Sequence, residues 1–458
     1  MTSDELDHDL CYRAARSRDA RFDGRFFVAV KTTGIYCRPI CPARTPLKRN
    51  VHFYPSAAAA EAGGFRPCLR CRPEVAPSSA AWSGTSATVS RALALIDDGA
   101  LDDTNADALA EKLGVGARHL RRLFVHHLGA PPNAVAQTRR AHLARVLLEQ
   151  SALPMTHIAE AAGFQSLRRF NAAMREAYGR PPRELRGRAP AQTRTQPPRP
   201  TIDIRLGYRG PYDWAALSGW LQARAINGIE AADGRTYTRG ALRAEHRPDQ
   251  RSIVVSIPAG ESATVQDVVR RARRLFDVAS DPLTIATQLK KDRDLAPLLR
   301  RHAGIRVPGA WDPFELAVRA IVGQQVSVAG ARTILGRIAA AHGGFAPEVL
   351  AEITLPGMPR RRAESIQALA QAVANGTVKL ERRATLDETI AMLTALPGIG
   401  PWTAHYIAMR ALGETDAFPA GDLILRRNAG NLSEKELLRR AEAWRPWRAY
   451  AAMLLWTR

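Results

Sequence analysis

The sequence is poor in acidic residues and in cysteine, and it has no long apolar run. Asp and Glu number 44 against 66 Lys and Arg, so the formal net charge is +22 and the expected partner is a polyanion such as nucleic acid. Five cysteines in 458 residues are too few for a disulfide framework. No stretch approaches the roughly eighteen apolar residues of a membrane span, and the opening MTSDELDHDL lacks the apolar core of a signal peptide. We therefore expect a cytoplasmic, nucleoid-associated protein with reduced cysteines and no membrane partner.

The length and two polar segments predict several domains. A chain of 458 residues corresponds to roughly three or four domains. The segments Arg72–Ala87 and Arg186–Pro200 are rich in proline and small or basic residues, which is typical of linkers. We expect domains over residues 1–76, 87–186, 201–285 and 286–458, with a linker over 187–200.

Four of the cysteines form two short pairs, Cys37 with Cys41 and Cys68 with Cys71. The spacing C-x3-C, twenty-six residues, C-x2-C suits four soft thiolates around one tetrahedral zinc ion. Four thiolates around a divalent cation leave a formal excess of two negative charges, which keeps the sulfurs nucleophilic. Spacing does not tell whether one sulfur reacts, and an inert structural zinc knuckle is the alternative.

An internal repeat lies between the two polar segments. The stretches ALAEKLGVGARHLRRLF, from Ala108, and HIAEAAGFQSLRRF, from His157, align at an offset of forty-nine residues. Each copy predicts a short helix, a turn glycine (Gly114 or Gly163) and a second helix that fits a DNA major groove. The predicted second helices carry donors for phosphates and base edges: Arg118, His119, Arg121 and Arg122 in the first copy, and Gln165, Ser166, Arg168 and Arg169 in the second. Two copies predict double-stranded DNA as the partner, whereas one copy alone could be a helical bundle with a solvated arginine face.

Two stretches of this N-terminal half resemble known families. The segment Ala87–Arg186 resembles an AraC-type domain, in which a long helix, here about Pro132–Gln150, joins the two helix-turn-helix units. The motifs TTGIYCRPIC, NVHFY and GFRPCLRCRPE closely resemble the N-terminal domain of the Ada alkylation-response protein. The first resemblance implies transcriptional regulation at a promoter, with RNA polymerase as a partner. The second implies that zinc-bound Cys37 removes a methyl group from a DNA phosphotriester.

Methyl transfer to Cys37 would be stoichiometric, because a thioether has no obvious route back to a thiolate. It would also remove one negative charge from a surface that faces DNA, which predicts tighter DNA binding after methylation. The neighbouring arginines that could hold phosphates are Arg38, Arg44, Arg66, Arg70 and Arg72. No cysteine follows Cys71, so we expect none of the guanine alkyl transfer that Ada proteins often add.

The chain after the second polar segment changes from alternating apolar stretches to helices. Residues 202–282 contain IDIRL, RTYTRGAL and SIVVSI, with a helical stretch over Trp214–Arg224, and predict a small α+β unit. Beyond Asp312 the pattern is helical. The run LPGIG followed by a helix predicts a helix-hairpin-helix motif, in which Gly398 and Gly400 let backbone amides approach a DNA phosphate. An ordinary glycine turn is the alternative.

Asp422 follows the predicted hairpin by about twenty residues. A carboxylate near the anomeric carbon can stabilise the positive charge that builds on a sugar when an N-glycosidic bond breaks. An N-cap for a helix beginning at Leu423 is a second, compatible role. The segment Ile202–Arg458 resembles AlkA-type DNA glycosylases for alkylated bases through PYDWAALSGWLQARAI, FELAVRAIVGQQVSVA, LPGIGPWTAHYIAMRAL and WRPWRAYAAMLLW.

The AlkA resemblance implies the residues of the site. It implies Asp422 as the catalytic carboxylate, Gln325 at the position of a DNA-intercalating wedge, and aromatic walls for a flipped base at Trp220, Trp402, Tyr406 and Trp456. Aromatic faces attract a cationic alkylated base by roughly 1 to 2 kcal/mol, although core packing is the alternative for each ring. Trp402 stands where strand-cutting relatives carry a Schiff-base lysine, so we expect base removal without strand cleavage. The four cysteines of the iron-sulfur cluster in some relatives are missing, so we expect no such cluster.

Together these features predict a multidomain, mostly helical protein with α+β parts. It combines a small zinc-binding α/β domain, an all-α double helix-turn-helix domain, an α+β glycosylase N-terminal domain and an all-α helix-hairpin-helix glycosylase domain. The predicted function is excision of bases of the 3-methyladenine type, together with methyl acceptance at one structural and catalytic zinc site that is coupled to transcriptional activation. The main alternative is a non-enzymatic alkylation sensor whose glycosylase-like part is an inactive DNA-binding arm.

Overall fold

The computed structural model describes residues 6–76, 87–151, 153–186, 201–258, 265–355, 357–382 and 384–458. The linker predicted over 187–200 and most of the segment Arg72–Ala87 lie outside the described residues. The contacts divide the chain into two compact units. Unit 1 comprises Met1–Arg209, Arg247–Arg270 and Val278–Ser280, and unit 2 comprises Gly210–His246, Arg271–Asp277 and Asp281–Arg458. None of the described helices is long and apolar enough to cross a membrane.

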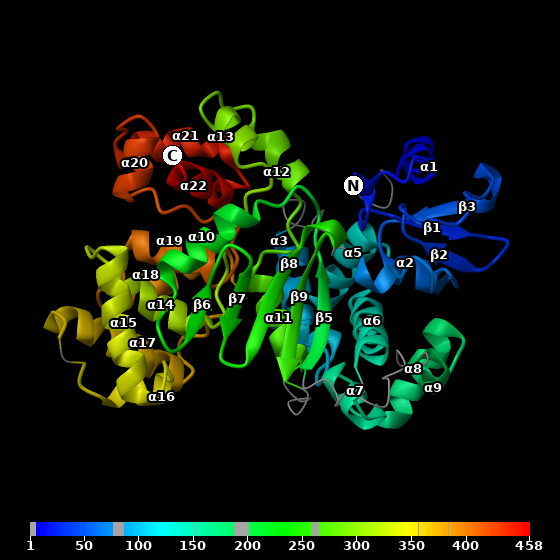
Figure 1. Ribbon diagram of the computed structural model, residues 1–458, viewed down its shortest axis with the longest axis horizontal. Helices are drawn as coiled ribbons and strands as arrows, with labels where there is room; N and C mark the ends of the chain where they lie inside the picture. Colours follow the sequence, from blue (N-terminus) through cyan, green and yellow to red (C-terminus); the bar gives the residue numbers. More distant parts are fainter. Residues whose placement is uncertain are drawn as a thin grey trace. The chain divides into compact units, whose positions relative to one another are not determined.

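The N-terminal part of unit 1 is a small sheet between two helices (Figure 1). The strand order is β3-β1-β2-β4, with β1 antiparallel to β2 and β3, and β2 parallel to β4. The helix α1 packs against Val28, and α2 covers Phe27 and Ala29, so β1 is buried on both faces. The elements are α1 (His8–Arg16), η2 (Ala20–Phe22), β1 (Phe27–Val30), β2 (Ile35–Cys37), η3 (Lys48–Asn50), β3 (Val51–Tyr54), α2 (Ala57–Ala62), β4 (Arg66–Pro67) and η4 (Pro73–Val75).

The next part of unit 1 is helical and contains both predicted helix-turn-helix copies. Gly114 and Gly163 adopt left-handed φ angles of 67° and 83° at the two turns, which favour glycine. The elements are α3 (Ala87–Asp97), α4 (Ala106–Lys112), α5 (Ala117–Leu128), α6 (Pro132–Gln150), α7 (Met155–Ala161), α8 (Leu167–Tyr178) and α9 (Pro182–Leu185). The long connecting helix predicted over Pro132–Gln150 is confirmed as α6.

The start of α8 corrects one expectation. The Ser166 hydroxyl accepts from the backbone N–H of Arg169 at 3.2 Å, so Ser166 is the N-cap and α8 begins at Leu167. Gln165 and Ser166 therefore lie in the turn before the second helix, not within it.

Strands follow in both units. In unit 1, β5 (Thr201–Gly207) pairs antiparallel with β9 (Ser252–Pro258), and its alternate residues Ile202, Ile204 and Leu206 are buried. In unit 2, β6 (Glu230–Ala232), β7 (Thr236–Arg239) and β8 (Leu242–Arg247) form an antiparallel meander. The short helix η6 (Pro248–Gln250) precedes β9, and α11 (Val265–Leu275) follows it.

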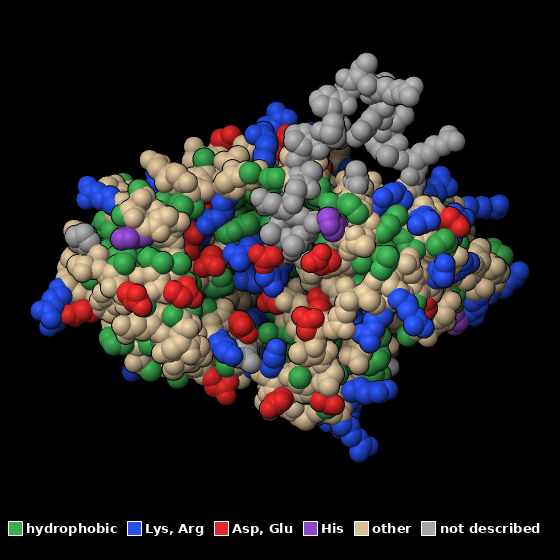
Figure 2. Space-filling model, turned by 90° about the horizontal axis from the view of Figure 1, so that it is seen from below, with side chains coloured by type: hydrophobic (Ala, Val, Ile, Leu, Met, Phe, Trp, Pro, Cys, Tyr) green, Lys and Arg blue, Asp and Glu red, His purple; other side chains and the backbone are tan. Residues whose placement is uncertain are grey.

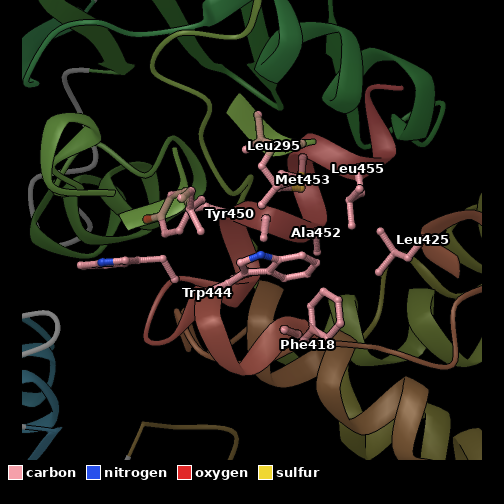
Figure 3. Close-up of a cluster of buried hydrophobic side chains, with 14 of the residues drawn as sticks. Leu295, Phe418, Leu425, Trp444, Tyr450, Ala452, Met453 and Leu455 are labelled. Atoms are coloured by element: carbon pink, nitrogen blue, oxygen red, sulfur yellow. The ribbon is translucent and has the colours of Figure 1, made fainter. Parts of the chain in front are cut away.

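The rest of unit 2 is helical, as predicted. Its helices are α10 (Trp214–Arg224), α12 (Pro282–Leu289), α13 (Leu295–Arg301), α14 (Pro313–Val322), α15 (Val328–His342), α16 (Pro347–Glu352), α17 (Arg360–Ala374), α18 (Leu386–Thr394), α19 (Pro401–Arg410), α20 (Leu423–Asn428), α21 (Glu434–Ala441), η8 (Glu442–Trp444) and α22 (Arg448–Trp456). One core cluster surrounds α22, where Figure 3 shows the Trp444 indole beside Phe418. A second cluster lies around α14 and α19. These two cores hold α19 and α22, which carry three of the predicted aromatic site residues.

Surface charge is dispersed on the face that Figure 2 shows. Lys and Arg side chains project there at many separate points, with Asp and Glu side chains among them. The positive surplus is therefore not gathered into a single patch on that face.

Candidate functional sites

The four cysteines of the predicted zinc site come together in unit 1. The sulfur atoms of Cys37, Cys41, Cys68 and Cys71 all lie within 4.8 Å of one another. Tetrahedral zinc with Zn–S bonds of about 2.3 Å places its sulfurs about 3.8 Å apart, so the donor set and its size fit zinc. Cys37 ends the strand β2 and is half-buried, whereas Cys71 is buried.

Backbone hydrogen bonds shape the two knuckles. The N–H of Arg38 donates to the Cys71 sulfur at 3.3 Å, and the N–H of Cys68 donates to the Tyr36 carbonyl at 2.9 Å. The N–H of Cys41 donates to the Arg38 carbonyl at 3.1 Å. Hydrogen bonds from backbone N–H groups therefore link the two segments that carry the cysteine pairs.

The five arginines near the cysteines divide into two groups. Arg38 pairs with Asp23 and donates to the Cys71 carbonyl at 3.2 Å. Arg72 pairs with Glu74 and Glu149, so both guanidinium groups are engaged within the protein. The other three arginines are exposed: Arg44, Arg66 and Arg70.

The zinc-binding part contacts the long helix α6 through a partly buried polar cluster. The Tyr36 hydroxyl donates to the Glu61 carboxylate at 2.8 Å and lies 3.1 Å from the Nε2 atom of His142. The Thr138 hydroxyl donates to the same carboxylate. Tyr36 directly precedes Cys37, so the neighbour of a zinc ligand contacts the helix that joins the two helix-turn-helix copies.

A second contact lies one to two turns further along α6. Glu149 pairs with Arg72, which directly follows Cys71, and with Arg145 of its own helix. Thr138, His142, Arg145 and Glu149 recur at the three- and four-residue spacing of one helix face. The sequence does not indicate this face, because these polar residues do not follow an apolar pattern.

The predicted base-reading arginines are exposed. In α5 these are Arg118, Arg121 and Arg122, and in α8 they are Arg168 and Arg169. Apolar residues of the same helices, such as Leu120 in α5 and Phe170 in α8, are buried. Each second helix therefore presents its arginines on the side opposite its core contacts.

Asp422 lies at the N-terminus of α20 and is half-buried. Its Oδ1 atom accepts from the backbone N–H of Leu425 at 2.9 Å, which confirms the predicted N-cap. The indole N–H of Trp402 donates to Oδ2 at 3.0 Å, and that of Trp456 donates to Oδ1 at 3.2 Å. Three N–H donors thus hold the carboxylate in one orientation.

The four predicted aromatic residues form one cluster around this carboxylate. Trp402 and Tyr406 are stacked, with ring centroids 5.4 Å apart and planes at 17°. The Trp456 ring lies 6.2 Å from Tyr406 and 5.3 Å from Trp220. All four rings are half-buried, so each keeps some surface for contact.

The hairpin glycines lie beside the predicted wedge residue. Gly398 has a φ of 74°, and a Cβ there would lie 1.9 Å from the Ser365 hydroxyl, so only glycine fits. The Gln324 side chain donates to the Gly398 carbonyl at 3.0 Å. The next residue, Gln325, is exposed and has a φ of 54°, and Gly400 is the N-cap of α19. The structure therefore brings Gln325 next to the hairpin.

Two buried or half-buried arginines near the aromatic cluster were not predicted as site residues. Arg410 donates to the Tyr406 hydroxyl at 2.7 Å, and the guanidinium of Arg224 lies 3.4 Å from the Trp220 ring centroid. Burial lowers the pKa of each guanidinium, and the Tyr406 hydroxyl opposes that shift. Arg224 ends a predicted helix, but no local pattern indicates that its side chain folds back over Trp220.

A cavity of about 690 Å³ lies elsewhere, in unit 1. Its lining carries the carboxylates of Asp98, Asp102, Asp103, Glu160 and Asp267. Apart from Arg270, the charged residues of this lining are acidic, and the lining lacks the stacked aromatic rings of the cluster at Asp422. The cavity is therefore separate from the predicted base site.

Comparisons with known proteins match the parts of the chain that carry these residues. Three family models match: the metal binding domain of Ada over residues 10–74, a helix-turn-helix domain over 109–188 and the AlkA N-terminal domain over 203–312. DNA-3-methyladenine glycosylase 2 of Escherichia coli is 30% identical, over 55% of this chain and 95% of its own length. The bifunctional transcriptional activator/DNA repair enzyme Ada of E. coli is 38% identical, over 35% of this chain and 43% of its own length.

One relative matches almost from end to end. The probable bifunctional transcriptional activator/DNA repair enzyme AlkA of Mycobacterium tuberculosis is 41% identical over 480 residues, which cover 98% of this chain and 96% of that protein. The order of the matched domains also agrees with the order of the zinc, helix-turn-helix and glycosylase-like parts described above. The chain therefore belongs to the family of bifunctional AlkA proteins, in which an Ada-type metal-binding domain and a helix-turn-helix domain precede an AlkA-type domain.

Proposed function

We propose that this protein repairs DNA alkylation in two ways and regulates transcription in response. Its C-terminal part hydrolyses the N-glycosidic bond of alkylated bases of the 3-methyladenine type. Its N-terminal part accepts a methyl group from a DNA phosphotriester on Cys37. The observation that carries the glycosylase proposal is the Asp422 carboxylate, which two indole N–H groups orient within an aromatic cluster.

The glycosylase step needs little from the protein beyond orientation and charge. A base alkylated on a ring nitrogen leaves with the electron pair of the glycosidic bond, and positive charge develops on the sugar. The Asp422 carboxylate lies where it can stabilise that charge and direct a water molecule to the anomeric carbon. The water oxygen bonds to that carbon and passes its proton to the Asp422 carboxylate, which releases it to solvent and so completes hydrolysis. Stacking on Trp402 and Tyr406 holds the flipped base.

Strand cleavage is not part of the proposal. A lyase needs an amine nucleophile to form a Schiff base with the sugar. The position where strand-cutting relatives carry that lysine is Trp402, whose indole N–H instead donates to Asp422. We therefore propose a monofunctional glycosylase that leaves an abasic site.

The methyl transfer uses the half-buried sulfur of Cys37. The thiolate attacks the methyl carbon, a C–S bond forms, and the C–O bond breaks with its electron pair moving to the phosphate oxygen. Zinc held by Cys37, Cys41, Cys68 and Cys71 would keep the sulfur deprotonated and offset the charge of the cluster. We propose that this one zinc site is both structural and catalytic.

The proposed regulation depends on the contact between the zinc site and α6. Methylation removes one negative charge beside DNA, which strengthens DNA binding by the exposed arginines of α5 and α8. Residues next to two of the zinc ligands, Tyr36 and Arg72, contact α6 directly. We propose promoter DNA and RNA polymerase as the partners in activation.

The glycosylase proposal is tested with duplex DNA that carries 3-methyladenine. We expect the full-length protein to release free base, and Asp422→Asn to release it at least about a hundredfold more slowly. Glu348→Gln, which neutralises an exposed carboxylate on α16, is the matched control and should match the wild type. If the wild type binds the DNA but releases no base, the C-terminal part is an inactive DNA-binding arm.

A further inference from the structure

The loop between α14 and α15 presents Gln325, the predicted wedge residue, in an uncommon backbone conformation. The loop comprises residues 323–327, and Gln325 is exposed with a left-handed φ of 54°. A residue other than glycine adopts this conformation at an energetic cost, so surrounding contacts have to hold it there. The preceding residue, Gln324, makes such contacts with both its side chain and its backbone.

The Gln324 side chain binds two parts of the helix-hairpin-helix motif. Its Nε2 atom donates to the Gly398 carbonyl at 3.0 Å and to the Thr403 hydroxyl at 2.9 Å. A glutamine amide has two N–H donors, so both are engaged within the motif. Gly398 lies in the hairpin turn and Thr403 in the first turn of α19. The side chain of Gln324 therefore links the loop to the turn and to the helix that follows it.

The backbone of Gln324 is held from a third element, α17. A terminal nitrogen of Arg362 donates to the Gln324 carbonyl at 2.7 Å. This carbonyl belongs to the peptide bond between Gln324 and Gln325, so the hydrogen bond restrains the backbone from which Gln325 starts. Three residues further along α17, the Ser365 hydroxyl leaves no room for a Cβ on Gly398. Helix α17 thus contacts both the loop and the hairpin.

We propose that Gln324 is a positioning residue for base flipping. It holds Gln325 at a fixed place beside the hairpin, so that the Gln325 side chain enters the base stack when the hairpin binds the DNA backbone. This inference rests on the proposed glycosylase function and specifies how the target base leaves the duplex.

The hydrogen bonds of Gln324 suit such a role. A side chain that enters the stack has to offset the cost of separating neighbouring bases. A loop that is already ordered loses less conformational entropy on binding than a loose one. Because the same amide binds the hairpin carbonyl, the distance between the hairpin and the inserted side chain is set before DNA is bound.

The test removes the two donors of Gln324 without changing charge. Gln324→Met keeps nearly the same length and is measured in the full-length protein. The matched control is Gln367→Met on α17, because the Gln367 amide makes the same kind of hydrogen bond to the Ile353 carbonyl at 2.7 Å. The probe is duplex DNA in which 2-aminopurine follows 3-methyladenine. The fluorescence of 2-aminopurine rises when it loses stacking on its neighbour, so it reports insertion before any bond is broken.

We expect Gln324→Met to reduce the fluorescence rise and to slow single-turnover base release about tenfold, because the hydrogen bonds that place Gln325 are lost. Affinity for undamaged DNA should stay unchanged. Gln367→Met should retain the wild-type fluorescence and rate. The melting temperatures of the two variants should be similar, since each loses the hydrogen bonds of one glutamine side chain. A merely structural role would lower the melting temperature without reducing the fluorescence rise.

A double variant tests whether Gln324 acts through Gln325. Gln325→Ala should reduce the fluorescence rise by itself, and Gln324→Met combined with it should be no slower than Gln325→Ala alone. Arg362→Met removes the backbone contact and should reduce the rise more than Arg361→Met, which loses the same charge from an exposed neighbour on α17.

Three results would overturn the inference while leaving the glycosylase proposal in place. They are base release by the wild type without a fluorescence rise, slower release by Gln324→Met with an undiminished rise, and independent slowing by the two substitutions in the double variant. Failure of the proposed function looks different, because the wild type would then give the fluorescence rise but release no base. In that case the fluorescence of Gln324→Met alone decides whether Gln324 positions Gln325.

Discussion

The indole N–H of Trp402 donates to the carboxylate of Asp422 at 3.0 Å, from a position twenty residues earlier in the chain. The same indole stacks on Tyr406. One side chain thus supplies both an aromatic wall and a hydrogen bond that orients the predicted catalytic group. Substitutions at Trp402 can separate these two contributions.

Trp402→Phe keeps an aromatic ring but removes the N–H donor. We expect base release from 3-methyladenine DNA to slow about tenfold, because the carboxylate loses one of its three orienting hydrogen bonds. Affinity for the damaged DNA should change little. Single-turnover rates and binding curves for Trp402→Phe and Trp402→Ala separate the effects, since only the alanine variant also loses stacking. Equal rates for Trp402→Phe and the wild type would contradict an orienting role.

Methyl transfer should mark Cys37 and no other cysteine. After exposure to DNA with methylphosphotriesters, mass spectrometry should find one added methyl group on the peptide that contains Cys37, at one equivalent per chain. Cys11→Ala is the matched control, because Cys11 is buried outside the cluster and burial raises its pKa to about 12. A methyl group on Cys68 instead, or none on any cysteine, would contradict the assignment.

Glu149→Gln should weaken the attachment of the zinc-binding part to α6. Glu149 pairs with both Arg72 and Arg145, so the substitution leaves Arg145 without this carboxylate and Arg72 with Glu74 alone. We expect the free energy of unfolding of unit 1 to fall by about 1 to 3 kcal/mol. A chelator should then remove zinc from the variant at lower urea concentrations than from the wild type. The control Glu111→Gln changes an exposed carboxylate on α4. Identical zinc release in both variants would show that the contact contributes nothing.

His405 should make unit 2 less stable in mild acid. Its Nδ1 atom accepts from the N–H of Phe418, and burial, with a smaller contribution from Arg448, lowers its pKa to about 4. The pKa of a histidine in an unfolded chain is about 6.5. Between the folded and the unfolded pKa, the unfolded chain therefore binds more protons than the folded one. Stability is therefore fully present above about pH 6.5 and falls toward pH 4, by up to about 3 kcal/mol.

His405→Gln cannot take up this proton, so the melting temperature of unit 2 should depend less on pH than in the wild type. Thermal melts at pH 7 and pH 5 measure the difference. His157→Gln replaces an exposed histidine in unit 1 and should leave the pH dependence unchanged. A wild-type slope that persists in His405→Gln would assign the acid sensitivity to other groups.

The sequence alone was enough for features that depend on neighbouring residues. The cysteine spacing predicted the metal cluster, because short chelating pairs bring sulfurs together almost regardless of the rest of the fold. The bounds of α6 and α10 and the Asp422 N-cap were also predicted correctly, since helix ends depend on local prolines, caps and apolar periodicity. The start of α8 was missed by two residues, because Ser166 caps the helix and does not extend it.

Only the tertiary structure decided which distant side chains meet. The Tyr36 hydroxyl contacts the Nε2 atom of His142, which lies 106 positions later in the chain. Nothing in the local sequence around either residue indicates this contact. The stacking of Arg224 on Trp220 depends on the end of α10, which Arg319 of α14 holds through a hydrogen bond to the Arg224 carbonyl. Spacing and periodicity thus determined the elements and the chemical groups of this protein. Long-range packing, which local patterns do not encode, decided how those groups are oriented and which of them remain open to a ligand.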